Sequence, residues 1–354
     1  MLRICIVVGA RPNFVKVAPL IRAIEGSASA SYSLVYAGSA DDPTLEPTLY
    51  ADLQMPCPDV FLGVVSSSLN EITSQVMARF DSHLERQPAD VVIVVDDLAS
   101  TMAAAIVAKK RGLRLAHLVA GTRSFDMKMP KEVNRLVIDA LSDILFTAGT
   151  RSSSVATREQ GDGANTYMVG NILMDSLRFC RPRLHKPAME GLEEGKYIVL
   201  TVNRRALISD ACKLGRILQA IAGAAGSTPV VTPLRGEAMN AVGSLVPSGS
   251  TFRVVAPLPY LEFGWLTAHA MGIITDSGNV AEEATFNGVP CITLNSYTEH
   301  QETVTVGSNV LVGEDPQQLA EAVARMTGGQ WKKSALPDRW DGRTAERIVK
   351  ILIG

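Results

Sequence analysis

Two adjacent carboxylates, Glu282 and Glu283, lie just past a glycine break in the C-terminal half of the chain. The run 271–275 before the break is apolar, and 281–286 after it favours a helix, so the pattern predicts strand, turn and helix. A helix start offers unpaired N–H groups to phosphate, and a carboxylate one turn further can accept hydrogen bonds from ribose hydroxyls. The segment 276–283 therefore indicates a nucleotide or sugar site, with an ordinary N-cap and acidic first turn as the alternative.

A second pair of acids, Asp96 and Asp97, follows the apolar run 91–95 and precedes small residues that start a helix. Charged residues at such a strand end are commonly functional, and N-capping is the other role open to Asp97. Asp97 is therefore a candidate for the functional edge of a sheet.

Cationic side chains follow two further strand ends. The turn 9–16 carries Arg11 and a proline suited to the first helical position, which fits an anion site and an ordinary strand-to-helix turn equally well. Arg123 and Arg135 follow the strand 114–119 and can grip phosphate, although a solvent-facing helix position is the default for Arg135.

Short β-branched runs alternate with helical stretches, which is typical of parallel sheets covered on both faces. The first series of predicted strands covers 2–8, 33–36, 91–95, 114–119 and 144–147. The second covers 197–201, 229–232, 251–255, 271–275 and 291–294. We expect two domains, 1–180 and 197–342, with a polar, proline-bearing linker at about 181–196 and an amphipathic helix at 343–353 that packs back on the first domain.

Open α/β sheets bind ligands at the carboxyl ends of their strands. The predicted fold is accordingly an α/β fold of two doubly wound Rossmann-type domains, with the parallel sheets facing an interdomain cleft. The motifs at the strand ends are expected to meet in that cleft.

The composition describes a soluble globular protein, because 47% of the residues are hydrophobic and 20% are charged. A net charge of −2 lacks the basic excess that nucleic-acid binding needs. Five scattered cysteines, none in a CxxC pair, indicate neither a disulfide framework nor a zinc site. Apolar runs of strand length and an N-terminus that enters a strand directly predict no membrane span and no signal peptide. We therefore expect a cytoplasmic protein without nucleic-acid or membrane partners.

Taken in order, these segments resemble the UDP-N-acetylglucosamine 2-epimerase family over nearly the full chain. The resemblance rests on GARPNFVKVAP at 9–19, SFD at 124–126, PKEVNR at 130–135, VGN at 169–171, DSG at 276–278, EE at 282–283, GVP at 288–290 and TE at 298–299. It implies a GT-B-like pair of Rossmann domains that hold a UDP-sugar, usually as a homodimer, with neither NAD nor an essential metal.

Members of that family invert C2 of UDP-GlcNAc by removing its proton and eliminating UDP to a glycal, and then add UDP back after reprotonation from the other face. Of the four acid–base positions that the resemblance implies, this chain keeps Asp97 alone. Val119 and Lys131 stand where the family has glutamates, and Asn203 stands where it has a histidine. Since a positioned acid or base contributes about 10²–10⁴-fold, these changes argue against ordinary epimerisation of UDP-GlcNAc and UDP-ManNAc unless Lys131 or Glu132 compensates.

The nucleotide contacts are better kept than the acid–base groups. The catalytic candidates are Asp97, Lys131 and Glu132. The substrate and nucleotide contacts are Arg11, Arg123, Arg135, Asn203, Arg204, Ser277, Gly278, Glu282, Glu283, Thr298, Glu299 and His300. The segment 37–40 reads Ala-Gly-Ser-Ala where many bacterial members have Thr-Gly-Gln-His, a segment associated with an activating second UDP-GlcNAc, so we expect that activator site to be absent.

Three functions fit this pattern. In the first, Asp97 with Lys131 or Glu132 epimerises or hydrolyses a UDP-linked N-acetylhexosamine. In the second, the scaffold is redirected to another proton abstraction and elimination, as a dehydratase or lyase on a nucleoside sugar. In the third, the protein binds a nucleotide sugar without catalysis or pairs with an active paralogue. All three predict a nucleotide-sugar or nucleoside ligand, and none calls for a cofactor.

Overall fold

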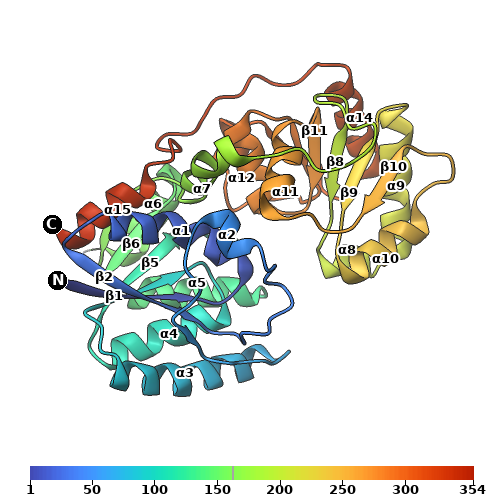
Figure 1. Ribbon diagram of the computed structural model, residues 1–354. Helices are drawn as coiled ribbons and strands as arrows, with labels where there is room; N and C mark the ends of the chain where they lie inside the picture. Colours follow the sequence, from blue (N-terminus) through green and yellow to red (C-terminus); the bar gives the residue numbers. More distant parts are fainter. Residues whose placement is uncertain (162) are drawn as a thin grey trace. The chain divides into compact units, whose positions relative to one another are not determined.

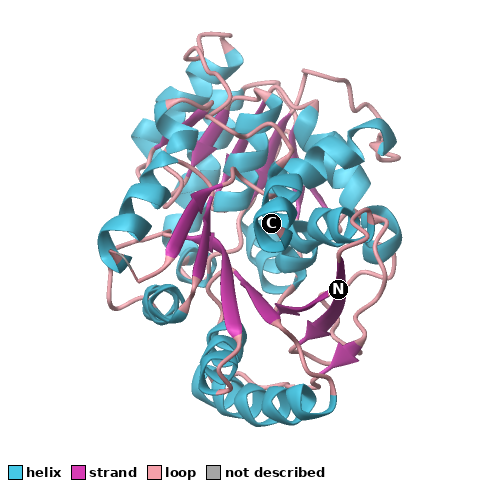
Figure 2. Cartoon of the chain, turned by 90° about the vertical axis from the view of Figure 1, so that its left-hand side faces the viewer, coloured by secondary structure: helices cyan, strands magenta, loops and turns pink. Residues whose placement is uncertain are grey.

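The protein is described by a computed structural model over residues 1–161 and 163–354. Its internal contacts divide the chain into two compact units, residues 1–180 with 338–354 and residues 181–337. Each unit holds one parallel sheet with helices against it (Figure 1). Figure 2 shows the strands enclosed by helices on both faces. The predicted α/β class with two doubly wound halves is confirmed.

The first unit is built on a seven-stranded sheet in the order β3-β2-β1-β4-β5-β6-β7, with every described pair parallel. Its strands are β1 (Leu2–Val8), β2 (Ala30–Tyr36), β3 (Val60–Phe61), β4 (Val91–Val95), β5 (Arg114–Ala120), β6 (Ile144–Thr147) and β7 (Asn165–Met168). Its helices are α1 (Arg11–Glu25), α2 (Leu49–Leu53), α3 (Leu69–Arg86), α4 (Ala99–Lys110), α5 (Pro130–Leu141), α6 (Thr150–Gln160), α7 (Leu173–Cys180) and α15 (Thr344–Ile353).

Helices cover both faces of this first sheet because its strands are apolar on both sides. Helices α3, α4 and α5 pack together, and α1, α7 and α15 pack together on the opposite side (Figure 1). Val92 and Val94 of β4 belong to the core that contains Phe80 of α3 and Ala104 of α4. Residues two apart in a strand point to the same face, so the other side chains of β4 are buried towards the second layer.

The second unit carries a six-stranded parallel sheet in the order β10-β9-β8-β11-β12-β13. Its strands are β8 (Ile198–Thr201), β9 (Val230–Pro233), β10 (Phe252–Val255), β11 (Gly272–Thr275), β12 (Cys291–Thr293) and β13 (Asn309–Leu311). Its α-helices are α8 (Arg205–Ile208), α9 (Ala211–Ala225), α10 (Gly236–Leu245), α11 (Tyr260–Ala268), α12 (Gly278–Asn287), α13 (Glu302–Thr305) and α14 (Pro316–Thr327), and a 3₁₀ turn covers Arg181–Arg183.

Alternation along β8 divides the core of the second unit into two layers. Ile198 and Leu200 pack with side chains of α9 and α14, whereas Tyr197 and Val199 pack with side chains of α11 and α12. A sheet buried on both faces in this way reads as a continuous apolar run, which is why the sequence pattern locates these strands.

Both sheets have a topological switch point, where the strand order reverses. It lies between β1 and β4 in the first unit and between β8 and β11 in the second. Chains leaving neighbouring strands at this point turn towards opposite faces of the sheet, which opens a crevice at the carboxyl ends of the strands. The residues that follow these four strands are therefore candidates for a ligand site.

The C-terminal helix α15 is held to the first unit by a buried carboxylate. Asp175 of α7 is 7% exposed and accepts hydrogen bonds from the backbone N–H groups of Thr344 (3.1 Å) and Ala345 (2.8 Å). The first N–H groups of a helix have no hydrogen-bond partner within that helix, so Asp175 of α7 acts as the cap of α15. Burial raises the pKa of Asp175 to about 6, although the two N–H groups act in the opposite direction.

We expect the contribution of Asp175 to the free energy of unfolding to fall as pH rises through about 6. The pKa of Asp175 in the folded protein lies above its unfolded value, so its stabilising contribution is complete below the unfolded pKa and is lost above the folded one. The loss is at most about 3 kcal/mol, at 1.36 kcal/mol per pKa unit. Unfolding of the wild type and of Asp175→Asn, which does not titrate, measured from about pH 4 to 8, gives this difference directly. A wild-type-minus-variant difference that stays constant with pH would contradict the prediction.

No helix in residues 1–161 and 163–354 combines the length and the apolar character needed to cross a membrane.

Candidate functional site

Asp97 lies at the carboxyl end of β4, beside the switch point of the first sheet. Its side chain is contacted from α5, whose residues Lys131, Asn134 and Arg135 share one helix face because they are spaced i, i+3 and i+4. Arg135 donates from Nε to Oδ2 at 2.8 Å and places a terminal nitrogen 2.6 Å from the same atom. Lys131 Nζ lies 3.4 Å from Oδ1, and Asn134 donates to the Asp97 carbonyl at 2.9 Å.

The charge around Asp97 keeps it ionised. Burial acts to raise the pKa of Asp97, but Lys131, Arg135 and Lys16 outweigh it and hold the pKa below its ordinary value. The side chain of Lys131 is 58% exposed, whereas those of Asp97 and Arg135 are largely buried. The site thus presents a buried carboxylate, a buried guanidinium and one exposed ammonium group. A carboxylate in this state can accept a proton, and the ammonium group can donate one.

Glu132 occupies a different position from its neighbour Lys131. It is 1% exposed, and its carboxylate accepts hydrogen bonds from Ser124 N (2.8 Å), Ser124 Oγ (2.9 Å), Phe125 N (3.0 Å) and Arg135 (3.1 Å). Burial acts to raise the pKa of Glu132, but these donors outweigh it and lower the pKa. With four donors on its two oxygens, Glu132 fixes the loop before α5 and the Arg135 guanidinium that bonds Asp97. These contacts favour a positioning role for Glu132 over proton transfer.

Arg123 lies in the interior of the first unit. Its terminal nitrogen is 2.7 Å from Asp139 Oδ2 and 2.6 Å from Glu159, and its other nitrogens bond Glu159 (3.1 Å) and the Thr122 carbonyl (2.8 Å). Asp139 in turn faces His117 Nδ1 at 2.5 Å. The side chains of Arg123, Asp139 and His117 are at most 2% exposed. The geometry therefore gives Arg123 protein partners, and the phosphate contact suggested by its sequence position stays a prediction.

Hydrogen bonds hold the start of α1 against the loop after β4. Asn13 accepts from the N–H groups of Gly9 (2.9 Å) and Ala10 (3.2 Å) and donates to Asp96 (2.6 Å). Lys16 bonds the other oxygen of Asp96 at 2.6 Å. Arg11, the predicted anion contact, pairs with Glu46 at 2.5 Å and keeps a quarter of its side chain exposed.

Strained backbone occurs at three residues of the first unit, one of which, Asp96, directly precedes Asp97. Asp96, Val119 and Phe125 have φ of 60°, 75° and 59°. Positive φ is costly for a β-branched residue such as Val119, which lies at a register shift between Leu118 and Ala120 where β5 bulges. Strain of this kind, about 1–3 kcal/mol per residue, persists only where surrounding contacts impose it, and it concentrates at functional sites.

In the second unit, Asp276 links the two strands of the switch point. Its Oδ2 accepts from the backbone N–H groups of Asn203 and Arg204, each at 2.8 Å, so the loop after β8 is held against the end of β11. Ser277 precedes α12 in an extended conformation, and its side chain forms no capping hydrogen bond. A Cβ added to Gly278 would meet nothing within 4 Å. The start of α12 is therefore open above its first backbone N–H groups, as an anion site requires.

Glu282 and Glu283 follow on the second turn of α12 and are 2% and 9% exposed. Glu282 lies 3.1 Å from His300 Nδ1, which joins α12 to the loop before α13. Thr298 accepts from the His300 N–H at 3.2 Å and shapes that loop, in which Glu299 is partly exposed. The structure thus brings together Glu282, His300 and Thr298 at one end of the sheet.

Arg204 and Asn203 differ in their surroundings. The Arg204 guanidinium donates to the Leu294 carbonyl at 3.1 Å and to Glu314, which also pairs with Lys213 at 2.6 Å. Asn203 is exposed at the end of β8. Arg204 is therefore anchored within the second unit, while Asn203 is exposed to solvent.

Two structural acids were not predicted from the sequence. Asp139 and Asp276 both accept hydrogen bonds from backbone N–H groups and thereby position loops at the sheet edges. An acid on the buried side of a helix, beside Ile138, is a signal that could have identified Asp139. The sequence pattern places Asp276 only in the turn before the helix. The loop after β8, whose N–H groups bond Asp276, lies more than seventy residues away in the chain.

The fold and the two sites define an α/β protein of the Rossmann type. It has an acid–base cluster at one switch point and, at the other, an open helix start beside buried carboxylates, where such folds bind ligands. A family model described as UDP-N-acetylglucosamine 2-epimerase matches residues 22–353. The chain belongs to this family, and the resemblance seen in its motifs is confirmed.

Relatives of known name span essentially the whole chain. The UDP-N-acetylglucosamine 2-epimerase of Methanocaldococcus jannaschii is 30% identical over 99% of both chains. The UDP-2,3-diacetamido-2,3-dideoxy-D-glucuronate 2-epimerase of Pseudomonas aeruginosa is 31% identical over 99% of both chains. The crystal structure of the M. jannaschii enzyme in complex with UDP-GlcNAc and UDP superposes with a TM-score of 0.84 at 28% identity, over 99% of both chains.

Proposed function

We propose that the protein acts on a UDP-linked 2-acetamido sugar by removing the proton at C2 and eliminating UDP, with Asp97 as the base. The observation that carries this proposal is the ionised, buried carboxylate of Asp97, held by Arg135 at the switch point of the first sheet. The relatives support the substrate class, since they are named for 2-epimerisation of UDP-linked acetamido sugars.

The proposed step balances without a further reactant. The C2–H bond breaks and its proton passes to the Asp97 carboxylate, while the electron pair forms a C1=C2 double bond. The C1–O bond breaks, and UDP leaves with the electron pair of that bond. The products are a glycal and UDP, and the overall oxidation state does not change, so the step calls for no redox cofactor.

Completing an epimerisation needs a proton donor on the opposite face of the sugar. Val119 has no ionisable group, and Glu132 already accepts four hydrogen bonds. Lys131 contacts Asp97 at 3.4 Å, so in this conformation the two groups address the same face. Elimination is therefore the step that the geometry supports best. Full epimerisation is the second candidate, because Lys131 is exposed and its flexible stem allows it to swing away from Asp97.

The test is incubation of the protein with UDP-GlcNAc, or with UDP-2,3-diacetamido-2,3-dideoxy-D-glucuronate, in D₂O. We expect UDP and glycal in the product mixture and deuterium at C2 of the recovered sugar, both visible by NMR. Appearance of the C2 epimer would favour the second candidate. UDP binding without release or exchange on either sugar would refute the proposal and leave the non-catalytic alternative.

For the nucleotide, we propose that phosphate binds at Ser277 and at the N–H group of Gly278, and that Glu283 accepts from the ribose hydroxyls. On this basis Glu283→Gln is expected to weaken UDP binding by about ten-fold or more, because hydrogen bonds to a charged group contribute about 1.5–3 kcal/mol. Isothermal titration with UDP measures the change. Glu321→Gln, on the exposed side of α14, is the matched control and is expected to bind UDP like the wild type. Equal affinities of Glu283→Gln and the wild type would remove Glu283 from the nucleotide site.

A further inference from the structure

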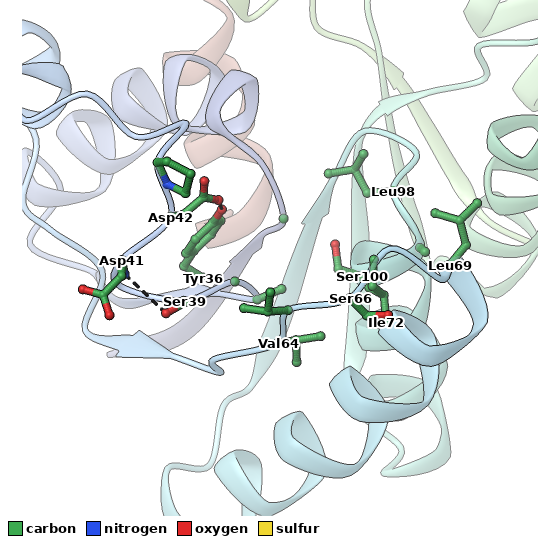
Figure 3. A pocket seen from close by; sticks show the side chains of 16 residues that line it. Tyr36, Ser39, Asp41, Asp42, Val64, Ser66, Leu69, Ile72, Leu98 and Ser100 are labelled. Atoms are coloured by element: carbon green, nitrogen blue, oxygen red, sulfur yellow. Dashed lines mark hydrogen bonds between the residues drawn. The ribbon is translucent and has the colours of Figure 1, made fainter. Parts of the chain in front are cut away.

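A cavity of about 470 Å³ lies within the first unit, at the carboxyl ends of β1, β2 and β4. On one side it is lined by the loop after β2, with Tyr36, Ser39, Asp41 and Asp42, and on the other by Leu98 and Ser100 at the start of α4 (Figure 3). Its volume is in the range of sites for small organic molecules, about 300–1,000 Å³. The mechanism proposed above uses none of these side chains.

The hydroxyl of Ser100 points to a ligand. Ser100 is 4% exposed and lines the cavity, and its hydroxyl forms no hydrogen bond with any residue of the described chain. It is pressed against Gly9, where an added Cβ would lie 2.0 Å from Ser100 Oγ. A hydroxyl that opens into a cavity in this way can bond a polar group of a bound molecule in place of water.

The charged side chains in the lining of the cavity are acidic. The lining includes the carboxylates of Asp41 and Asp42, and among the residues that the structure describes it contains no lysine, arginine or histidine. Burial acts to raise the pKa of Asp42, but hydrogen bonds from Tyr36 and Thr44 outweigh it and lower the pKa, so Asp42 is ionised at neutral pH. The exposed carboxylate of Asp41 accepts no hydrogen bond from the described residues. Phosphates and carboxylates are disfavoured here, and donors and cations are favoured.

Apolar side chains form the rest of the wall. Val64, Leu69, Ile72 and Leu98 lie across from the carboxylates, and Leu69 is 47% exposed at the rim. A molecule that fills the cavity therefore needs one apolar face and, on the other side, groups that donate hydrogen bonds.

We propose that this cavity binds a phosphate-free, sugar-sized molecule that carries a primary amine. The ammonium group lies at Asp41 and Asp42, a hydroxyl group bonds Ser100, and the carbon face packs on Leu69 and Leu98. The cavity includes residues 37–39 of the segment in which the family resemblance implies an activating nucleotide, and its charge selects against one. This proposal does not depend on the reaction proposed above.

The experiment is titration of the full chain with D-glucosamine as the probe, followed by saturation-transfer NMR. N-acetylglucosamine, glucosamine 6-phosphate and UDP serve as comparison ligands. We expect glucosamine to bind in the millimolar range or tighter, glucosamine 6-phosphate to bind more weakly, and UDP not to displace glucosamine.

Two variants assign the binding to the cavity. Asp41→Asn changes an exposed side chain and is expected to weaken glucosamine binding by about ten-fold, and Ser100→Ala by a few-fold. Glu85→Gln, at the far end of α3, is the matched control and keeps the wild-type affinity. The proposal is overturned if glucosamine does not bind, if N-acetylglucosamine or glucosamine 6-phosphate binds as well as glucosamine, or if Asp41→Asn binds like the wild type.

Discussion

Asp97→Asn is expected to lower kcat for UDP elimination by about 10²–10⁴-fold, the usual contribution of a positioned general base. Asparagine has nearly the same shape as aspartate and keeps an oxygen that accepts from Arg135, but it cannot take the C2 proton. The UDP affinity is expected to stay close to that of the wild type, because the proposed nucleotide contacts belong to the second unit. UDP release and C2 deuterium exchange measure the rate, and titration with UDP measures the affinity.

Asp90→Asn provides the control for this experiment. Asp90 precedes the amino end of the same strand, and its exposed ion pair with Arg3 at 2.6 Å contributes little to stability. We expect its turnover to stay within about two-fold of the wild type, since the exposed pair lies at the other end of the strand and does not touch the site. Wild-type turnover by Asp97→Asn, or an equal loss in both variants, would rule out Asp97 as the base.

The strands at the middle of each sheet could be predicted from the sequence, and so could the edge strand β10, but the edge strands β3, β7 and β13 could not. β4 and β8 are buried on both faces, so each is a continuous apolar run. β3 has only two residues, and β7 (Asn165–Met168) alternates exposed and partly buried positions. An edge strand has one neighbour and less cover, so β3 and β7 do not need a continuous apolar run.

Predictions for the site were limited because the sequence does not show tertiary contacts. The chain order places Asp97 and Gly278 at strand ends, because residues that follow parallel strands share one edge of the sheet. It does not show that Glu132 accepts four hydrogen bonds from its surroundings, or that Asp139 lies beside His117 and Arg123. A charge on a helix is predicted to face solvent until its tertiary partner is known.

Arg123→Met is expected to lower the free energy of unfolding by about 3–5 kcal/mol, the cost of breaking a buried ion pair by removing one partner. Methionine preserves much of the apolar stem but leaves Asp139 buried without its guanidinium, although His117 and the Gly121 N–H still contact it. Chemical unfolding measures the loss. A substrate contact would behave differently, since its removal would raise KM and leave stability nearly unchanged.

The contrast is sharpened by two further variants. Arg158→Met removes an exposed arginine from α6 and is expected to change stability by no more than about 0.5 kcal/mol. The double variant Arg123→Met with Asp139→Asn is expected to recover part of the loss, because it also removes the uncompensated buried charge. If Arg123→Met unfolds like the wild type while its KM rises, Arg123 contacts the substrate and the buried network contributes little to the stability of the first unit. If it loses stability and the double variant regains some, the network that carries Arg123 supports the loop beside Asp97 from within the core.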